Sequence, residues 1–147
     1  MQVLLAKKRR KIGVGLWNGW GGKVEKDDTS VRAAAARELF DEARLHVDPA
    51  ALDYRGKVTF YNKDAAMPVV VVHLFLATEW SGEVTVEETE MSDPTWWPIK
   101  ELPFDEMPAS DYDWLPLILD GHTIEATAWN GPNQRSISKP TVVRIIE

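Results

Sequence analysis

The segment GGKVEKDDTSVRAAAARELFDEARL, from Gly21 to Leu45, decides how this sequence is interpreted. Aliphatic residues recur at every fourth position from Val31, which predicts a helix from about Ser30 to Arg44. The Asp-Thr-Ser run at residues 28–30 offers side-chain oxygens that can cap the first turn of this helix. Five of the nine glycines lie upstream of it, within residues 13–22. The segment therefore predicts a glycine-dense loop that leads into a helix.

Three carboxylates of the predicted helix share one face. Glu38, Asp41 and Glu42 are spaced i, i+3 and i+4, which places them within one turn. Like charges at this spacing repel, and a divalent cation would relieve the repulsion because magnesium and manganese prefer hard oxygen ligands. An isolated pattern of this kind is more often a solvated acidic face. The glycine-dense loop and the Arg37–Glu38 pair that opens the acidic turn favour a metal site instead.

The segment resembles the Nudix box, whose pattern is G-x5-E-x7-R-E-U-x-E-E-x-G-U with U an aliphatic residue. The matching positions are Gly22, Arg37, Glu38, Leu39, Asp41, Glu42 and Leu45. Three features depart from the pattern. The loop is one residue longer, so the first box glutamate falls on either Asp28 or Thr29. Aspartate replaces glutamate at Asp41, and Arg44 stands where the box has glycine.

Segments outside the box extend the resemblance to the Nudix hydrolases of oxidised purine nucleoside triphosphates. They are VLLAKKRRKIGVGLWNGWGGKV at residues 3–24, PFDEM at 103–107, residues 111–116 and the Trp-Asn-Gly turn at 129–131. The resemblance implies one α/β domain over residues 1–147, an α/β/α sandwich with a mixed β-sheet. The sequence starts about one strand later than the family pattern, so the family's first strand is expected to be shortened or absent.

Hydrophobic patterning predicts the other elements. A second helix is expected over Asp111 to Leu119, with Pro116 tolerated in its first turns. Strands are expected over Val3 to Lys8, Tyr54 to Tyr61, Pro68 to Thr78 and Thr95 to Pro98, with a C-terminal hairpin of His122 to Trp129 and Ser136 to Ile146.

The resemblance assigns metal and catalytic residues to the acidic turn. The implied ligands of Mg²⁺, which Mn²⁺ could replace, are Gly22, Glu38, Asp41, Glu42 and Glu90. The implied catalytic residues are Glu38, Glu42, Glu90 and Arg37. Arg37 would orient the carboxylates through charged hydrogen bonds. Glu87 and Glu88 compete for the role given to Glu90, which is preferred because the following Met91 also matches the family.

The resemblance also implies a nucleotide pocket. Asn18 and Asp111 would contact the purine, and Trp114 would stack on it. The remaining substrate-binding residues implied are Lys8, which would reach the phosphates, and Trp20 and Trp129, which could line the pocket. The departures from the family here are Ser110 in place of a second aspartate, and Pro108 and Ile12 in place of aromatic residues. Two neighbouring carboxyls can share a proton and so read different purine tautomers, and Asp111 alone predicts narrower recognition.

Composition narrows the partners. With 17 basic and 23 acidic residues, the formal net charge is −6, which argues against a nucleic acid polymer as partner. The longest apolar stretch, residues 69–76, is far shorter than the roughly 20 residues that span a bilayer. The chain has no cysteine, which fits a reducing compartment. We therefore expect a cytoplasmic monomer without membrane association that acts on a small nucleotide.

Three functional hypotheses result. The leading one is a Mg²⁺-dependent pyrophosphohydrolase that converts oxidised purine nucleoside triphosphates, such as 8-oxo-dGTP, to nucleoside monophosphate and pyrophosphate and so cleanses the nucleotide pool. The second is a Nudix hydrolase of another nucleoside diphosphate derivative, such as ADP-ribose or a dinucleotide. The third is a nucleotide-binding sensor without catalysis, against which the intact Glu38, Asp41 and Glu42 argue.

Overall fold

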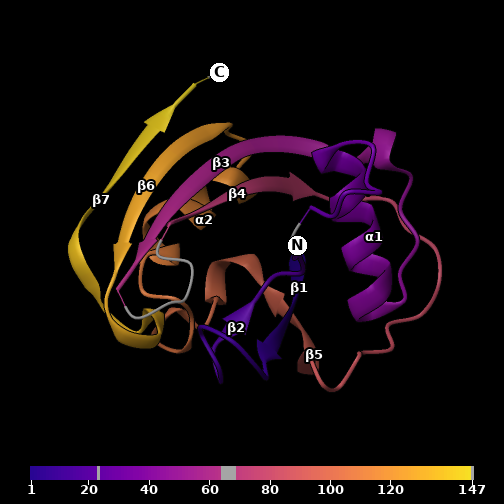
Figure 1. Cartoon of the computed structure of the whole chain (residues 1–147), viewed down its shortest axis with the longest axis horizontal. Coiled ribbons are helices and arrows are strands. Elements are labelled where there is room, and N and C mark those ends of the chain that lie inside the picture. The colour runs from indigo at the N-terminus through magenta and orange to yellow at the C-terminus, as the bar shows by residue number, and fades with distance from the viewer. Residues whose placement is uncertain (23, 64–68, 147) are drawn as a thin grey trace.

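The computed structural model describes residues 1–22, 24–63 and 69–146, which form two β-sheets and two α-helices (Figure 1). The smaller sheet is antiparallel, in the order β2-β1-β5, with β1 at Gln2–Lys8, β2 at Trp17–Asn18 and β5 at Met91–Pro98. The larger has the order β4-β3-β6-β7, with β3 at Asp53–Asn62, β4 at Val69–Leu76, β6 at Ile124–Asn130 and β7 at Ile137–Ile145. Because β3 and β6 run parallel and the other neighbours antiparallel, the predicted mixed sheet is confirmed.

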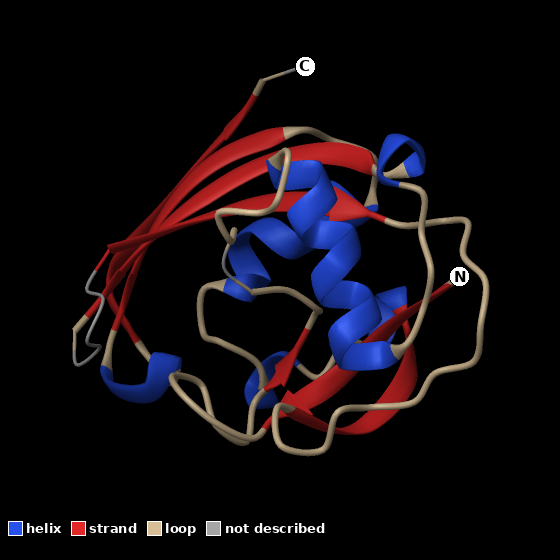
Figure 2. Cartoon of the chain, turned by 45° about the vertical axis from the view of Figure 1, so that its right-hand side comes forward, coloured by secondary structure: helices blue, strands red, loops and turns tan. Residues whose placement is uncertain are grey.

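Helix α2, Asp111–Leu119, packs between the two sheets. Its Trp114 and Ile118 join the buried side chains of the larger sheet, including Val58 and Ile124. Its Leu115 also contacts the cluster of the smaller sheet, built on Leu5, Trp17, Leu102 and Met107. Figure 2 shows the arched larger sheet above the helices and the smaller sheet below them. The predicted mixed α/β fold is therefore confirmed, and α2 is the element that joins its two halves.

Helix α1, Val31–Ala43, has well-defined ends. Its N-cap is Ser30, whose hydroxyl oxygen accepts a hydrogen bond from the backbone N–H of Ala33 at 3.0 Å. At its other end, Arg44 takes a left-handed conformation with φ 59° and donates its N–H to Phe40. This conformation explains why glycine suits the position in the box pattern, since a residue with a Cβ adopts it at a cost of roughly 1–2 kcal/mol.

For the remaining elements, the sequence predicted the type of secondary structure better than the residues at which it begins and ends. Helix α2 has the predicted bounds, and β6 and β7 form the predicted antiparallel hairpin. Strand β5 begins four residues earlier than predicted, and β2 was not predicted because it lies inside the glycine-dense loop. Pro68, the predicted start of β4, lies outside the described residues. Short 3-10 helices occupy Pro49–Ala51, Ile99–Glu101, Phe104–Glu106 and Pro132–Gln134. Among the described residues, no helix is long and apolar enough to cross a bilayer.

Gly56 allows β3 to lie directly against β6. It has φ +103°, and a Cβ there would overlap the backbone carbonyl of Ile124 in the neighbouring strand. Gly121 has a nearly identical φ of +98°, but a Cβ there would meet no atom within 4 Å. Gly56 is thus required both for its lack of a side chain and for its left-handed backbone, whereas Gly121 is required only for its backbone conformation.

We predict that Gly56→Ala lowers the free energy of unfolding by about 3 kcal/mol, because it combines a clash with backbone strain. Gly121→Ala should cost only about 1 kcal/mol, from strain alone. Urea denaturation followed by tryptophan fluorescence measures both. Equal losses in the two variants would contradict the direct packing of β3 on β6.

Candidate active site

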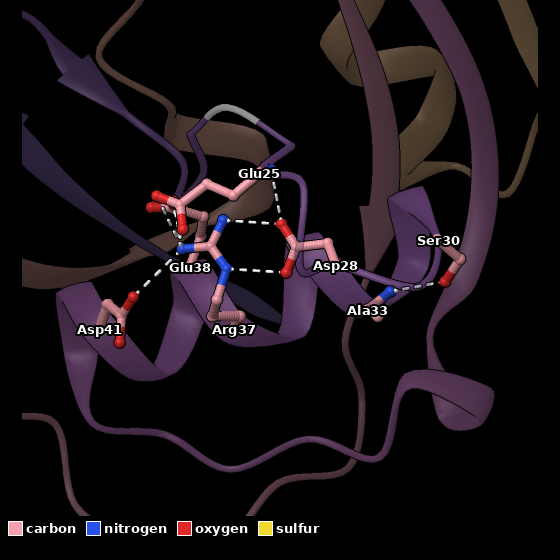
Figure 3. A network of polar contacts seen from close by, with 7 residues as sticks. All are labelled: Glu25, Asp28, Ser30, Ala33, Arg37, Glu38 and Asp41. Carbon is pink, nitrogen blue, oxygen red and sulfur yellow. Dashed lines mark hydrogen bonds and ion pairs between the residues drawn. The ribbon is translucent and has the colours of Figure 1, made fainter.

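The guanidinium of Arg37, in the middle of α1, binds acidic side chains of this helix and of the loop before it (Figure 3). It donates two parallel hydrogen bonds to Asp28, from Nε to Oδ1 at 2.9 Å and from Nη2 to Oδ2 at 3.0 Å. Its Nη1 reaches Glu38 at 2.8 Å and Asp41 at 3.2 Å. The paired hydrogen bonds match the planar fork of arginine, which gives this contact both strength and a fixed direction.

Asp28 is the residue of the long loop that faces Arg37. Its carboxylate also accepts a hydrogen bond from the backbone N–H of Glu25 at 2.7 Å, and the hydrogen bonds from Arg37 are the main reason that its pKa lies below the usual value. The sequence left the first box position open between Asp28 and Thr29. The structure gives Asp28 the contact with the box arginine.

The glycine-dense loop rests on the carboxylates of α1. The backbone N–H of Gly21 donates to Glu42 Oε1 at 3.0 Å. At Gly22, a Cβ would lie only 2.5 Å from the carboxyl carbon of Glu38, so no larger residue fits there without movement. Burial raises the pKa of Glu42 to about 7, and the neighbouring carboxylates of Glu38 and Glu90 add to the rise. Loop and helix thus meet at two acidic groups that repel each other.

Lys8, the last residue of β1, and Glu90, the residue before β5, complete this acidic site. Glu90 Oε1 accepts from Arg10 at 3.0 Å, and its negative charge acts on both Glu42 and Lys8. Lys8 is half-buried, and burial lowers its pKa while Glu42 and Glu90 oppose that effect. Glu87 instead accepts from the Thr89 hydroxyl at 2.8 Å and Glu88 is exposed. Of the three glutamates that competed for the role, Glu90 is the one that faces Glu42.

Asp41 is the most exposed of the four carboxylates expected to bind the metal. Its side chain is 53% exposed and is bound to Arg37. Within residues 1–22, 24–63 and 69–146, no three acidic or histidine side chains are gathered closely enough to hold a metal ion. The oxygen donors available nearby are those of Glu38, Glu42, Glu90 and Asp41, together with the carbonyl of Gly22. A complete ligand set would require these groups to close around a cation.

Two of the residues predicted to contact the base are half-buried or buried, in elements that meet beside the acidic site. Asn18 ends β2, and its side-chain amide donates to the Leu16 carbonyl at 3.4 Å. Asp111 opens α2, is only 6% exposed, and has its pKa raised to about 8 by burial. Its carboxyl is therefore neutral at pH 7 and can donate a hydrogen bond.

The predicted aromatic residues do not gather in one place. Trp114 packs in the main core, and its indole N–H has no hydrogen-bond partner among the described residues. Trp20 donates to the Leu4 carbonyl at 3.1 Å and packs beside α1. Trp129 alternates with the buried Ala128 and Asn130, so it faces the other side of the larger sheet, stacked on Tyr61 with ring centroids 5.9 Å apart. Of the three predicted aromatic residues, Trp114 is the one that shares a helix with Asp111, three residues away on α2.

The three positions that depart from the family surround the start of α2 and the glycine loop. Ser110 is fully buried, and its hydroxyl has no hydrogen-bond partner in the described part of the chain. Pro108 is buried and Ile12 half-buried. Sequence reasoning missed two buried amides, Asn62 and Asn130, which hydrogen-bond each other at 3.0 Å. The sequence did contain a signal for them. In each strand every second residue faces the core, and the last of these core-facing positions is occupied by a polar asparagine.

Comparison with known proteins identifies the family. The NUDIX domain model matches residues 1–118, and the chain belongs to the NUDIX family. Nudix hydrolases use divalent metal ions. The oxidized purine nucleoside triphosphate hydrolase of Danio rerio is 41% identical over 118 residues, covering 80% of this chain and 72% of that protein. The protein of the same name from Mus musculus is 37% identical over 119 residues, with the same coverage.

Solved structures agree with this assignment. A MutT NUDIX hydrolase from Burkholderia pseudomallei superposes with a TM-score of 0.62 at 27% identity, covering 69% of this chain and 77% of its own. The MutT protein of Bacillus halodurans reaches a TM-score of 0.72 over 98% of this chain and 89% of its own, at 24% identity. The second comparison shows that the fold extends over nearly the whole chain.

The raised pKa of Asp111 makes the stability of the protein depend on pH. Its carboxyl keeps its proton up to about pH 8 when folded, against the usual value of 3.8 when unfolded. Between these two pH values the folded state therefore binds more protons than the unfolded state. The stability that this difference contributes is complete below about pH 4 and is lost as the pH rises through about 8. We predict that Asp111→Asn flattens the fall of the free energy of unfolding between about pH 5 and pH 8 by up to about 1.4 kcal/mol per pH unit.

Urea denaturation at a series of pH values measures this slope. The matched control is Asp113→Asn, a change of the same kind at an exposed position of the same helix. Its slope should equal that of the wild type. Identical slopes for Asp111→Asn and wild type would contradict a neutral Asp111.

Proposed function

We propose that this chain is a Mg²⁺-dependent pyrophosphohydrolase that converts oxidised purine nucleoside triphosphates, such as 8-oxo-dGTP, to nucleoside monophosphate and pyrophosphate. The observation that carries the proposal is that Glu42, held by the glycine-dense loop, lies within the electrostatic influence of Glu38, Glu90 and Lys8. The substrate class is supported by the two relatives named for it, at 41% and 37% identity.

The acidic groups suit a divalent cation. Glu38, Asp41, Glu42 and Glu90 supply hard oxygen donors, which magnesium prefers, and Mn²⁺ can replace it. The repulsion that Glu38 and Glu90 exert on Glu42 is relieved by a positive charge among them. When bound, the cation neutralises phosphate charge and lowers the pKa of water. Gly22 lies against the Glu38 carboxylate, and its carbonyl is the fifth proposed donor.

The other residues of the site bind and orient the reacting groups. Arg37 fixes the direction of Glu38, and the Gly21 N–H fixes that of Glu42. Lys8 binds the phosphate chain, where the negative charge keeps its amine protonated. Glu90, held by Arg10, accepts the proton of the attacking water as the new P–O bond forms. The bond from the attacked phosphorus to the oxygen that bridges the α- and β-phosphates breaks in the same displacement; that oxygen keeps the electron pair, and the products are nucleoside monophosphate and pyrophosphate.

The base is proposed to lie between the ends of β2 and α2. Asn18 offers a half-buried amide there, and neutral Asp111 offers an O–H donor to an acceptor on the purine edge. Trp114 supplies an aromatic face at the same end of the core, whereas Trp20 and Trp129 would line the pocket only after moving. With Ser110 beside it instead of a second carboxyl, Asp111 reads one tautomer, which predicts narrow base selectivity.

A parallel assay of 8-oxo-dGTP, 2-hydroxy-dATP, dGTP and ADP-ribose, with and without Mg²⁺, tests the proposal. We predict that kcat/KM for 8-oxo-dGTP exceeds that for dGTP at least about tenfold, which is about 1.4 kcal/mol of transition-state preference. Activity should disappear with EDTA and return with Mg²⁺. Ion-exchange separation of the products should give nucleoside monophosphate and pyrophosphate.

A variant assigns this activity to the acidic site. Glu42→Gln keeps shape but removes a charge, and we expect turnover to fall at least about a hundredfold with the fold intact. Glu101→Gln, the same change at an exposed position, is the control and should match the wild type. Preference for ADP-ribose would overturn the substrate, and full activity of Glu42→Gln would overturn the site.

A further inference from the structure

A cluster of three amide side chains lies at the end of the larger sheet, beside the proposed base pocket. Asn130 Nδ2 donates to Asn62 Oδ1 at 3.0 Å, and Gln134 Nε2 donates to the same oxygen at 3.4 Å. Asn62 and Asn130 are buried, at 5% and 1% exposure, whereas Gln134 is half-buried. These three residues, called the amide cluster below, have no part in the chemistry derived above.

The turn that carries Gln134 is tied to both segments that the proposed function assigns to the base. On one side, the side-chain oxygen of Asn133 accepts from the N–H of Gly13, five residues before Asn18, at 2.9 Å. On the other side, the carbonyl of Gln134 accepts from the N–H of Ala109, two residues before Asp111, at 2.8 Å. The turn thus bridges the glycine loop and the start of α2.

The side chain of Gln134 converges with Asn18 and Lys8 over Gly13. A Cβ placed on Gly13 would lie 2.8 Å from Gln134 Oε1, 3.8 Å from Lys8 Cδ and 3.9 Å from Asn18 Nδ2. The stem of the proposed phosphate-binding lysine and the amide of the proposed base-binding asparagine therefore lie around the same position as the side-chain oxygen of Gln134. Gly13 leaves room for this convergence because it has no side chain.

The backbone holds Gln134 in an unfavourable conformation. Asn133 and Gln134 both have left-handed φ values, 51° and 59°. Asparagine tolerates this region better than most residues with a Cβ, but glutamine gains no such advantage. Strain of this kind persists where the surroundings fix it, and it is concentrated at functional sites.

The amide cluster fixes which atom Gln134 presents. Since Asn62 Oδ1 accepts from Gln134 Nε2, the Oε1 of Gln134 is left as an acceptor above Gly13. Asn130 Oδ1 is a second acceptor, buried without a hydrogen-bond partner among the described residues. A buried acceptor of this kind calls for a donor. Of these two acceptors, Asn130 Oδ1 is enclosed, whereas Oε1 of the half-buried Gln134 is the one that a ligand N–H group can reach.

We propose that Gln134 is a specificity-determining residue, positioned by Asn62, whose Oε1 accepts a hydrogen bond from an N–H on the edge of an oxidised purine. The inference rests on the proposed function. An unmodified purine has a bare acceptor nitrogen at position 7, whereas an 8-oxopurine carries a hydrogen there. An acceptor oxygen at this place accepts from the oxidised base and opposes the unmodified one, so Gln134 favours the damaged nucleotide.

Steady-state kinetics of Gln134→Leu with 8-oxo-dGTP and dGTP tests this role. We expect KM for 8-oxo-dGTP to rise about tenfold with kcat within about twofold, and KM for dGTP to stay unchanged or fall. Gln2→Leu, the same change at an exposed position on β1, is the matched control. Gln134→Met, which keeps the length of the side chain, is measured in parallel with thermal unfolding, so that a folding defect in one variant leaves the other informative.

The positioning role of Asn62 has its own readout. Asn62→Asp keeps the oxygen that accepts from Gln134 and should retain the preference for 8-oxo-dGTP, whereas Asn62→Leu should lose it as Gln134→Leu does. An unchanged ratio of the two kcat/KM values in both Gln134 variants, or an equal loss for both substrates, overturns the inference while the proposed function stands. A wild-type protein without preference for 8-oxo-dGTP overturns both.

Discussion

The contact between Arg37 and Asp28 is the constraint from which the rest of the site follows. It joins the loop before α1 to the middle of that helix through two parallel hydrogen bonds of 2.9 and 3.0 Å. With the loop held there, the Gly21 N–H reaches Glu42 and Gly22 lies against Glu38. The same guanidinium binds Glu38, so the positive charge of Arg37 opposes the repulsion among the carboxylates of the acidic turn.

The site extends from this acidic end to an amide-rich end, and Lys8 lies between them. Its charged neighbours are Glu42 and Glu90, while its side-chain stem approaches Gly13 together with Asn18 and Gln134. A nucleoside triphosphate has the same polarity, with charged phosphates at one end and a base that forms hydrogen bonds at the other. The mixed sheet supplies the amide-rich end, because Asn62 and Asn130 occupy the last core-facing positions of β3 and β6.

Local sequence signals predicted the elements to which the proposed chemistry is assigned. The four-residue recurrence and the Asp-Thr-Ser cap predicted α1, and the box pattern singled out Arg37, Glu38 and Glu42. The direction of individual side chains was harder to predict from sequence. The box spacing grouped Asp41 with Glu38 and Glu42, but Asp41 is bound to Arg37 and its side chain is largely exposed. Trp129 was grouped with Trp114, yet strand alternation turns it to the opposite face. The amide cluster depends on contacts between residues that are far apart in the sequence. Asn62 is separated by 68 positions from Asn130 and by 72 from Gln134, and no local pattern encodes such contacts.

The central claim is that Arg37 arranges the acidic turn as a metal site, and equilibrium binding of Mn²⁺ tests it most directly. Electron paramagnetic resonance would count free Mn²⁺ in the wild type, in Arg37→Lys and in the control Arg144→Lys, whose arginine pairs with Glu125 at the surface. The account predicts Mn²⁺ binding that weakens about tenfold or more in Arg37→Lys, as loss of an orienting contact to a ligand does, with no change in the control. Equal affinity in all three proteins, each folded, would contradict it.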